Sequence, residues 1–424
     1  MRVVPAAMMR PIQRLIGGYS GGLARSTVTI FLWNALRLSA QLVWVVLIAR
    51  ALGVSGYGSF SGVAGIAIAI SGMSGLGQGL RMYQDVARDA TAFGDRWTQA
   101  MRVLVWSAVP LAGLFVLVSQ LALPNIPLQL VLAIAVSEVV FAPAIHQMAS
   151  AYAAHQRMSR AASLPVVLSA ARVLAALAFY LLPDDAGLAA YGWLHALSSA
   201  LAVALAVTMF RSDFGLVRAE TRLTKAVLLQ GLGFTPLWVS RLAQGTVDKG
   251  VALRLGGGGV AGEYSAAHRL STLAAMPVEA LVAAVMPRLF RAGAGQDHNP
   301  RLMTSLLVLT LCYGITAGCA LFLLAPLLPF VLGHAFESAV PVATLLAWYV
   351  PVYCIRILGA NVLLGYGWKR WRISIEVVGF ILLVTLMLAW IPTFGALGAA
   401  YALLAAEVLI VLLGWWKIAT SFRR

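Results

Sequence analysis

Residues 29–50 read TIFLWNALRLSAQLVWVVLIAR, an apolar run long enough to cross a lipid bilayer as one helix. Three polar side chains interrupt its middle: Asn34, Arg37 and Gln41. An arginine at the bilayer centre costs from about 3 kcal/mol on insertion scales to ~10 kcal/mol or more in simulations. Lipid cannot satisfy such a group, so this helix must turn it toward protein or toward a water-filled cavity.

The composition extends this conclusion to the whole chain. Of its 424 residues, 61% are hydrophobic and only 11% are charged, and the mean hydropathy is +0.87. Soluble domains average about 45–50% apolar and ~25% charged residues, so the sequence predicts a polytopic membrane protein. Segment 1–26 has no continuous apolar core that ends in a small-residue cleavage site, and we expect no signal peptide there.

Twelve apolar stretches are long enough to span a membrane. They cover about 27–49, 57–80, 101–123, 126–152, 161–183, 186–210, 226–248, 264–290, 302–332, 339–365, 371–392 and 394–416. With an even number of spans, both termini and every even-to-odd loop share one side, and most of the 31 Lys and Arg fall there. The positive-inside rule therefore places both termini in the cytoplasm. This bias accounts for most of the +16 net charge without nucleic-acid binding.

Short sequence repeats divide the chain into two halves. GVSGYGSFS at 53–61 returns as GVAGEYSAA at 259–267, and LPDDAGLAAYGWL at 182–194 returns as IPTFGALGAAYAL at 391–403. Because six spans separate the copies, both halves keep the same orientation. We expect an all-α protein of two pseudo-symmetric six-helix lobes. Its parts are an N-terminal cytoplasmic segment 1–26, an N-lobe 27–210, a linker 211–225, a C-lobe 226–416 and a cytoplasmic tail 417–424.

Charged residues inside the spans occur as five arginines and five carboxylates. A helix rises 1.5 Å per residue, so the depth of each charge can be compared with that of its neighbours. Matching depths predict three contacts between helices: Glu138 with Arg172, Arg356 with Glu376, and Asp248 with Arg269. We interpret the first two as structural ion pairs. The third is either a clasp at the outer membrane surface or a simple interfacial contact.

Two polar stripes remain, one in each half. Asn34, Arg37 and Gln41 recur at i, i+3 and i+7 on the first span, and Arg241, Gln244 and Asp248 repeat that spacing on the seventh, 207 residues later. Such spacing places each set on one helix face. The stripes either form a buried hydrogen-bonded seam or line a central cavity. An arginine-lined cavity suits an anion, because the guanidinium fork matches phosphate oxygens.

The sequence predicts no metal or cofactor site. Cys312, Cys319 and Cys354 all lie in predicted spans, where free thiols usually serve packing, and no CxxC or HExxH spacing occurs.

Several segments resemble a family of polysaccharide exporters. RALGVSGYGSF at 50–60 resembles its Arg-x-Leu-Gly-x-x-x-Tyr-Gly motif, and DKGVALRLGGGGVAGEYSAAHRL at 248–270 resembles its signature in the second lobe. The resemblance covers nearly the whole chain and is to the Wzx-type oligosaccharide flippases of the multidrug/oligosaccharidyl-lipid/polysaccharide exporter (MOP) superfamily. It implies a V-shaped, MATE-like transporter in a bacterial inner membrane. By alternating access it would move polyprenyl-diphosphate-linked glycans for lipopolysaccharide or exopolysaccharide biosynthesis.

This resemblance gives each candidate residue an expected role. Arg37 and Arg241 would hold the diphosphate with help from Arg269, while Asn34, Gln41 and Gln244 would contact sugar or phosphate. Asp248, Glu279 and Glu407 are candidates for a gate or for ion coupling. The expected partners are the lipid-linked glycan, membrane lipids and other polysaccharide assembly proteins, with no nucleic acid and no enzymatic activity.

Two other functions stay open. A cation-coupled multidrug exporter of the same superfamily usually needs an acidic first lobe, whereas the first span here offers Arg37 and no carboxylate. A membrane glycosyltransferase or polymerase commonly carries catalytic acids on large outer loops, and the outer loops of this chain are short.

Overall fold

The computed structural model describes residues 21–183, 186–233, 235, 245–293 and 300–422. Every regular element in this part of the chain is helical. The first half contains α2 (Gly21–Ser71), η1 (Ser74–Gly77), α3 (Gln78–Arg88), η2 (Ala90–Ala92), α4 (Phe93–Ala122), α5 (Leu128–Ile134), the π-helix η3 (Ala135–Phe141), α6 (Ala142–Ala154), α7 (Met158–Tyr180) and α8 (Leu188–Phe214).

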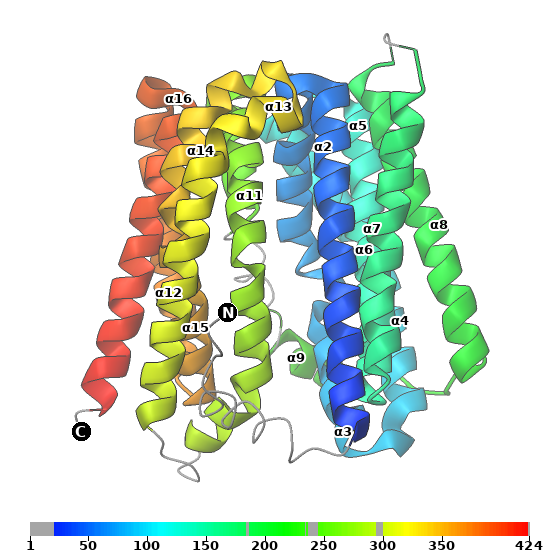
Figure 1. Ribbon diagram of the computed structural model, residues 1–424. Helices are drawn as coiled ribbons and strands as arrows, with labels where there is room; N and C mark the ends of the chain where they lie inside the picture. Colours follow the sequence, from blue (N-terminus) through cyan, green and yellow to red (C-terminus); the bar gives the residue numbers. More distant parts are fainter. Residues whose placement is uncertain (1–20, 184–185, 234, 236–244, 294–299, 423–424) are drawn as a thin grey trace, which may run out of the picture.

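The second half follows the short helix α9 (Lys225–Leu232). It contains α11 (Val247–Gly293), α12 (Pro300–Leu324), η4 (Ala325–Leu327), α13 (Leu328–Leu332), η5 (His334–Ala339), α14 (Val340–Ala347), α15 (Tyr349–Gly365) and α16 (Lys369–Phe422). The two halves stand side by side, with α2 and α11 next to each other at the centre (Figure 1).

The three longest helices are hairpins that reverse at a glycine. Gly53 in α2, Gly257 in α11 and Gly395 in α16 have φ of 64°, 73° and 57°, a region that costs other residues a steric penalty. In α2, the rings of Trp44 and Phe60, on opposite sides of Gly53, lie 6.0 Å apart. Gly53 and Gly257 have nearly the same ψ as well, −179° and −174°, so the sequence repeat is also a repeat of backbone conformation.

The number of spans depends on how these hairpins are counted. Eight helices pass a test of length and hydropathy, and a ninth is added if the pair His334–Ala347 and Tyr349–Gly365, bent by 46°, is one span. With the two arms of each hairpin counted separately, the described residues have helices in the other predicted segments, whereas much of the predicted seventh span, 226–248, lies outside the described residues. The chain is thus a multi-pass membrane protein.

The predicted second span, 57–80, is wrong after Ser71. The second arm of α2 ends at Ser71, and Gly75 and Gly77 then take φ of 70° and 72°, which interrupts the helix before α3. These two glycines therefore break the predicted span.

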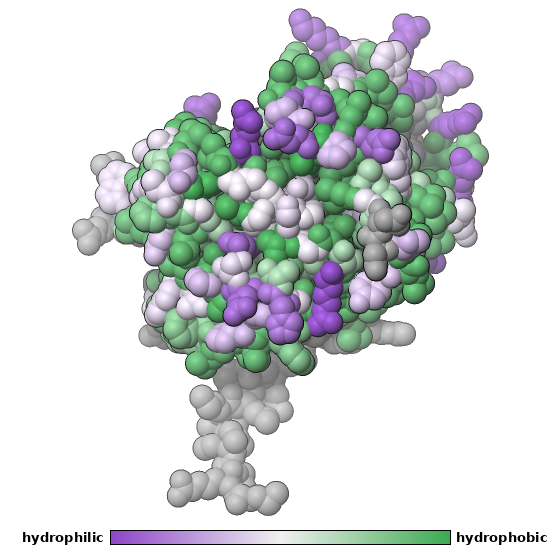
Figure 2. Space-filling model, turned by 90° about the horizontal axis from the view of Figure 1, so that it is seen from above, coloured by the Kyte–Doolittle hydropathy of each residue, from purple (hydrophilic) through white to green (hydrophobic). Residues whose placement is uncertain are grey.

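The hairpins of α2 and α11 meet tightly at the end of the molecule that carries their turns, here called the turn end. A Cβ atom added at Gly58 would lie 2.9 Å from Gly262 Cα and closer still to Gly258 O. Ordinary carbon contacts are about 3.5–4.0 Å, so only glycine permits this approach. Seen from the turn end, the surface is filled across its centre (Figure 2).

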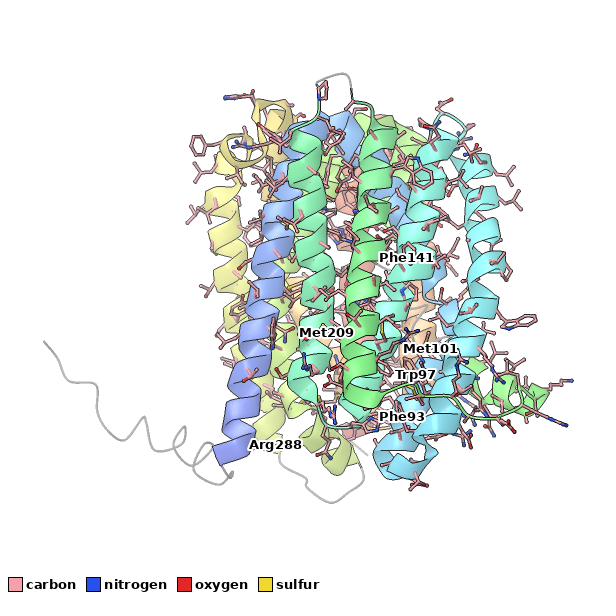
Figure 3. All side chains as sticks on the ribbon, turned by 90° about the vertical axis from the view of Figure 1, so that its right-hand side faces the viewer. Phe93, Trp97, Met101, Phe141, Met209 and Arg288 are labelled. Carbon is pink, nitrogen blue, oxygen red and sulfur yellow. The ribbon has the colours of Figure 1, made fainter. Side chains whose placement is uncertain are left out.

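The opposite end is rich in basic residues and is here called the basic end. Arg288 lies there at the foot of α11, as do Phe93 and Trp97 at the start of α4 (Figure 3). Trp97 stacks on Phe210 of α8 at 4.2 Å between ring centroids, which fixes α4 against α8. Large apolar side chains such as Trp106, 77% exposed, point outward, as expected for a surface that faces lipid.

Candidate functional site: an arginine cluster between the two halves

A hydrogen bond between the two halves marks the centre of the site. Arg269 of α11 donates from Nη2 to Gln41 Oε1 of α2 at 3.0 Å. Gln41 lies 12 residues before the Gly53 turn and Arg269 lies 12 residues after the Gly257 turn, so the two hairpins bring them to the same depth. Two of the predicted site residues are therefore in direct contact.

Three arginines gather around this contact. The charges of Arg37 on α2 and Arg172 on α7 both act electrostatically on Arg269. Among the described residues no carboxylate lies within ion-pair distance of Arg269, and its Nε is buried without a hydrogen-bond partner. Asn34 lies one turn from Arg37 toward the basic end and is exposed. The cluster therefore presents several donors and an excess of positive charge.

Aromatic residues separate the arginine cluster from the turn end. Trp44 Nε1 donates to the Tyr191 hydroxyl at 2.8 Å, and the Phe60 ring packs edge-on against Tyr191 at 5.1 Å. Tyr57 is buried and acts electrostatically on Arg269. Together with the glycine contacts above them, these rings close the site toward the turn end.

Arg172 is held by a buried carboxylate, as predicted. Its Nη2 forms a salt bridge with Glu138 Oε1 on the π-helix η3. The same oxygen lies 2.9 Å from His195 Nε2 and 3.0 Å from the Ser137 hydroxyl. Depth alone located this pair, but the histidine and serine that complete it gave no signal in the sequence.

The predicted contact between Asp248 and Arg269 is wrong. Asp248 is buried and accepts a 2.6 Å hydrogen bond from the Tyr264 hydroxyl, with His268 Nδ1 at 3.4 Å. Lys249 Nζ lies 3.8 Å from its other oxygen. The reversal at Gly257 folds Asp248 back onto its own hairpin, whereas Arg269 faces α2.

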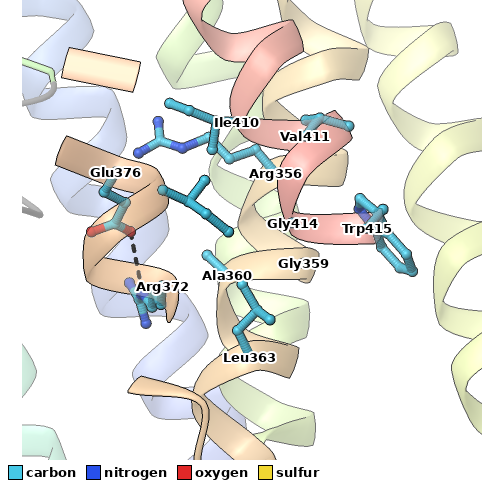
Figure 4. A pocket seen from close by; sticks show the side chains of 11 residues that line it. Arg356, Gly359, Ala360, Leu363, Arg372, Glu376, Ile410, Val411, Gly414 and Trp415 are labelled. Atoms are coloured by element: carbon cyan, nitrogen blue, oxygen red, sulfur yellow. Dashed lines mark hydrogen bonds and ion pairs between the residues drawn. The ribbon is translucent and has the colours of Figure 1, made fainter. Parts of the chain in front are cut away.

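Arg356 and Glu376 lie beside the same cavity, but each forms its ion pair with another residue. Arg356 Nη1 of α15 lies 2.7 Å from Glu407 Oε1, and Glu376 lies 3.1 Å from Arg372 Nε. Both arms of α16 reach this depth, and Arg356, Arg372 and Glu376 border one small cavity (Figure 4). Glu407, a candidate for ion coupling, thus has an ion-pair partner.

The remaining predicted residues divide into two groups. Glu279 on α11 lies 3.5 Å from the Tyr353 hydroxyl of α15, so its contact lies inside the second half. Arg241 and Gln244, which the sequence predicts as the second stripe, lie outside the described residues. Sequence reasoning missed Arg172 as a neighbour of Arg269, since it assigned Arg172 to a structural pair alone.

The sequence profile of a family described as "Polysaccharide biosynthesis protein" matches residues 23–292. The chain belongs to this family. The match begins at the start of α2 and ends at the foot of α11, so the family region includes every residue of the arginine cluster. A search of curated protein sequences gives no match.

Several solved structures share the fold of this chain at low sequence identity. The chain is similar to "Lipid II flippase MurJ, inward closed conformation", with a TM-score of 0.73, 12% identity, and coverage of 92% of this chain and 87% of that one. It is also similar to a multidrug resistance MATE family transporter of the MOP superfamily in an inward-facing conformation. The TM-score is 0.69 and the identity 14%, with coverage of 91% of this chain and 94% of that one. A third similar structure is a MOP superfamily transporter from Pyrococcus furiosus, described as having a binding pocket of reverse polarity. The TM-score is 0.59 and the identity 13%, with coverage of 94% of each chain.

Proposed function

We propose that this protein is a flippase that moves polyprenyl-diphosphate-linked oligosaccharides across a bacterial inner membrane for surface or exopolysaccharide biosynthesis. The observation that carries the proposal is the arginine cluster of Arg37, Arg172 and Arg269 between the two halves. Among the described residues Arg269 has no carboxylate within ion-pair distance, although a charge in a membrane interior is tolerated only with a partner. A diphosphate supplies that partner.

The proposed orientation follows from the distribution of basic residues. Arg88, Arg157, Arg211 and Arg288 lie at or near helix ends on the basic side, which the positive-inside rule assigns to the cytoplasm. The turn end then faces the periplasm. Glycine and aromatic contacts close the turn end. The arginine cluster would therefore receive its ligand from the cytoplasmic side, where lipid-linked intermediates are assembled.

The transport step is proposed as rocking of the two halves. The N-lobe of 27–210 and the C-lobe of 226–416 would separate at the turn end and approach each other at the basic end, with 211–225 as the linker. Arg37 and Arg172 belong to one lobe and Arg269 to the other, so a bound diphosphate would contact both lobes. Gln41 and Asn34 would contact phosphate or sugar.

The alternative of a multidrug exporter has support only from the fold shared with MATE transporters. Cationic drugs need an acidic site, and the contact between the halves carries Arg269 and Arg37 instead. Drug sensitivity of a deletion strain with normal glycans would favour this alternative.

The test uses Arg269→Gln in proteoliposomes that contain a fluorescent polyprenyl-diphosphate-linked sugar. Losing a charge-assisted hydrogen bond costs about 1.5–3 kcal/mol, so flipping at limiting substrate should fall roughly 10- to 150-fold. Arg254→Gln is the matched control, because Arg254 lies on the same hairpin but is exposed near the turn. Equal flipping by both variants, or export of normal surface glycan by cells with Arg269→Gln, would refute the proposal.

A further inference from the structure

Glu138 has an unusual setting for one half of a buried ion pair. It lies in a seven-residue π-helix, Ala135–Phe141, and π-helical turns occur frequently at functional sites. Adjacent residues of a regular helix do not face the same partner, yet Ser137 and Glu138 both contact α8. The Ser137 and Ser199 hydroxyls are 3.0 Å apart, and His195 lies 2.9 Å from the carboxylate. Besides Arg172, the carboxylate is therefore contacted by two polar side chains, His195 and Ser137, and Ser199 in turn contacts Ser137.

Arg172 lies on the more open side of this pair. Its side chain is 20% exposed, whereas that of Glu138 is 6% exposed. Arg172 donates to Glu138 through Nη2, and its Nε is buried without a hydrogen-bond partner among the described residues. The arginine thus keeps unused donors while its charge acts on Arg269 across the contact between the two halves.

These observations describe an arginine with two anions within its reach. Without a ligand, Glu138 neutralises Arg172. An anion bound at Arg37 and Arg269 would lie beside the same guanidinium, whose planar fork suits two phosphate oxygens. Glu138 would meanwhile repel that anion. Since His195 and Ser137 also contact Glu138, the carboxylate can lose the arginine at a smaller cost than an isolated buried charge.

We propose that Arg172 is a third diphosphate-binding residue and that Glu138 is an internal competitor, which occupies Arg172 until the diphosphate displaces it. This proposal rests on the proposed function of the arginine cluster. Its consequence is weakened substrate binding, because the ligand must first break an ion pair. Weakened binding favours release on the far side of the membrane, so Glu138 would trade affinity for turnover.

The experiment measures binding of farnesyl diphosphate to the purified full chain in detergent at fixed ionic strength, by thermophoresis. Glu138→Gln should bind at least fivefold more tightly, and Arg172→Gln at least tenfold more weakly. The double variant should bind like Arg172→Gln, since Glu138 acts only through that arginine. Glu263→Gln is the matched control, because it also removes one negative charge but lies six residues after the Gly257 turn, nearer the turn end than Arg269. It should change affinity less than twofold.

Each failure points to a different conclusion. If Glu138→Gln binds no more tightly than the wild type while Arg269→Gln still weakens binding, the competitor is refuted and the proposed function stands. If farnesyl diphosphate binds no better than farnesol and Arg269→Gln changes nothing, the proposed function itself fails. Should Glu138→Gln fold poorly, Glu138→Asp gives the same test, because its shorter side chain withdraws the carboxylate from Arg172 and should also raise affinity. An Arg172→Lys variant with wild-type affinity would likewise refute the role of the guanidinium fork.

Discussion

Closure of the turn end depends on Gly58, and the change Gly58→Ala should open it. The new Cβ would lie 2.9 Å from Gly262 Cα, about 1 Å inside an ordinary carbon contact. The other close atoms, Gly258 O and Gly262 N, belong to the backbone, so no side-chain rotation can relieve the clash. The two hairpins must therefore move apart by roughly 1 Å to keep this contact.

The magnitude follows from the cost of overpacking. An extra methyl group in a well-packed interface costs about 1–3 kcal/mol, which corresponds to a 5- to 150-fold shift between closed and open populations. Alanine also favours an isolated helix over glycine by about 0.5–1 kcal/mol, and this gain is the same in both states. The clash alone should thus set the direction of the shift.

The assay is electron–electron distance measurement between spin labels at the turn end. Labels at Leu181 and Phe330, 85% and 80% exposed, report on the first and second halves, after the three native cysteines are replaced by alanine. Gly58→Ala should add a longer-distance population. Gly113→Ala is the control, because its Cβ would meet nothing within 4 Å. Identical distributions for the two variants would show that the glycine contact does not hold this end closed.

Two further predictions concern ion pairs and hydrogen bonds. Glu407→Gln leaves Arg356 buried without the carboxylate of its ion pair, which should cost about 3–5 kcal/mol of stability and lower the melting temperature in detergent. Changing both residues to leucine should recover most of the lost stability. Equal losses for the single and double variants would contradict the ion pair. Arg50→Ala removes two hydrogen bonds that Arg50 of α2 donates to the carbonyls of Phe330 and Val331, at 2.7 and 2.8 Å. The longer-distance population of the spin labels at the turn end should therefore grow. An unchanged distance distribution would exclude a role for Arg50 in closure.

The sequence predicted features that depend on depth in the membrane. The polar stripe on residues 29–50 and the pair of Glu138 with Arg172 follow from the position of each charge along its helix. Depth could also have found the contact of Gln41 with Arg269, since both lie 12 residues from the repeated glycine turn. The resemblance between the turns at Gly53 and Gly257 was visible in the repeated motif.

Rotation about the helix axis could not be predicted. Glu376 and Glu407 lie on the two arms of one hairpin, and both arms border the cavity beside Arg356, so depth does not distinguish them. For the same reason Asp248 seemed able to reach Arg269, although it turns toward Tyr264. The π-helix at 135–141 has no sequence signal comparable to a glycine turn.

The placement of the arginines links the cost of burying them to transport. Arg172 and Arg269 lie on different halves, and their like charges repel each other across the interface. An anion between them reverses the sign of that interaction. A ligand shifts a conformational equilibrium only if its affinity for the two states differs. An anion that contacts both halves meets this condition, whereas an anion held by Arg37 alone does not. Under the proposed function, an anion between Arg172 and Arg269 would bring charge of the opposite sign with the substrate, and Glu138 would neutralise Arg172 on the return.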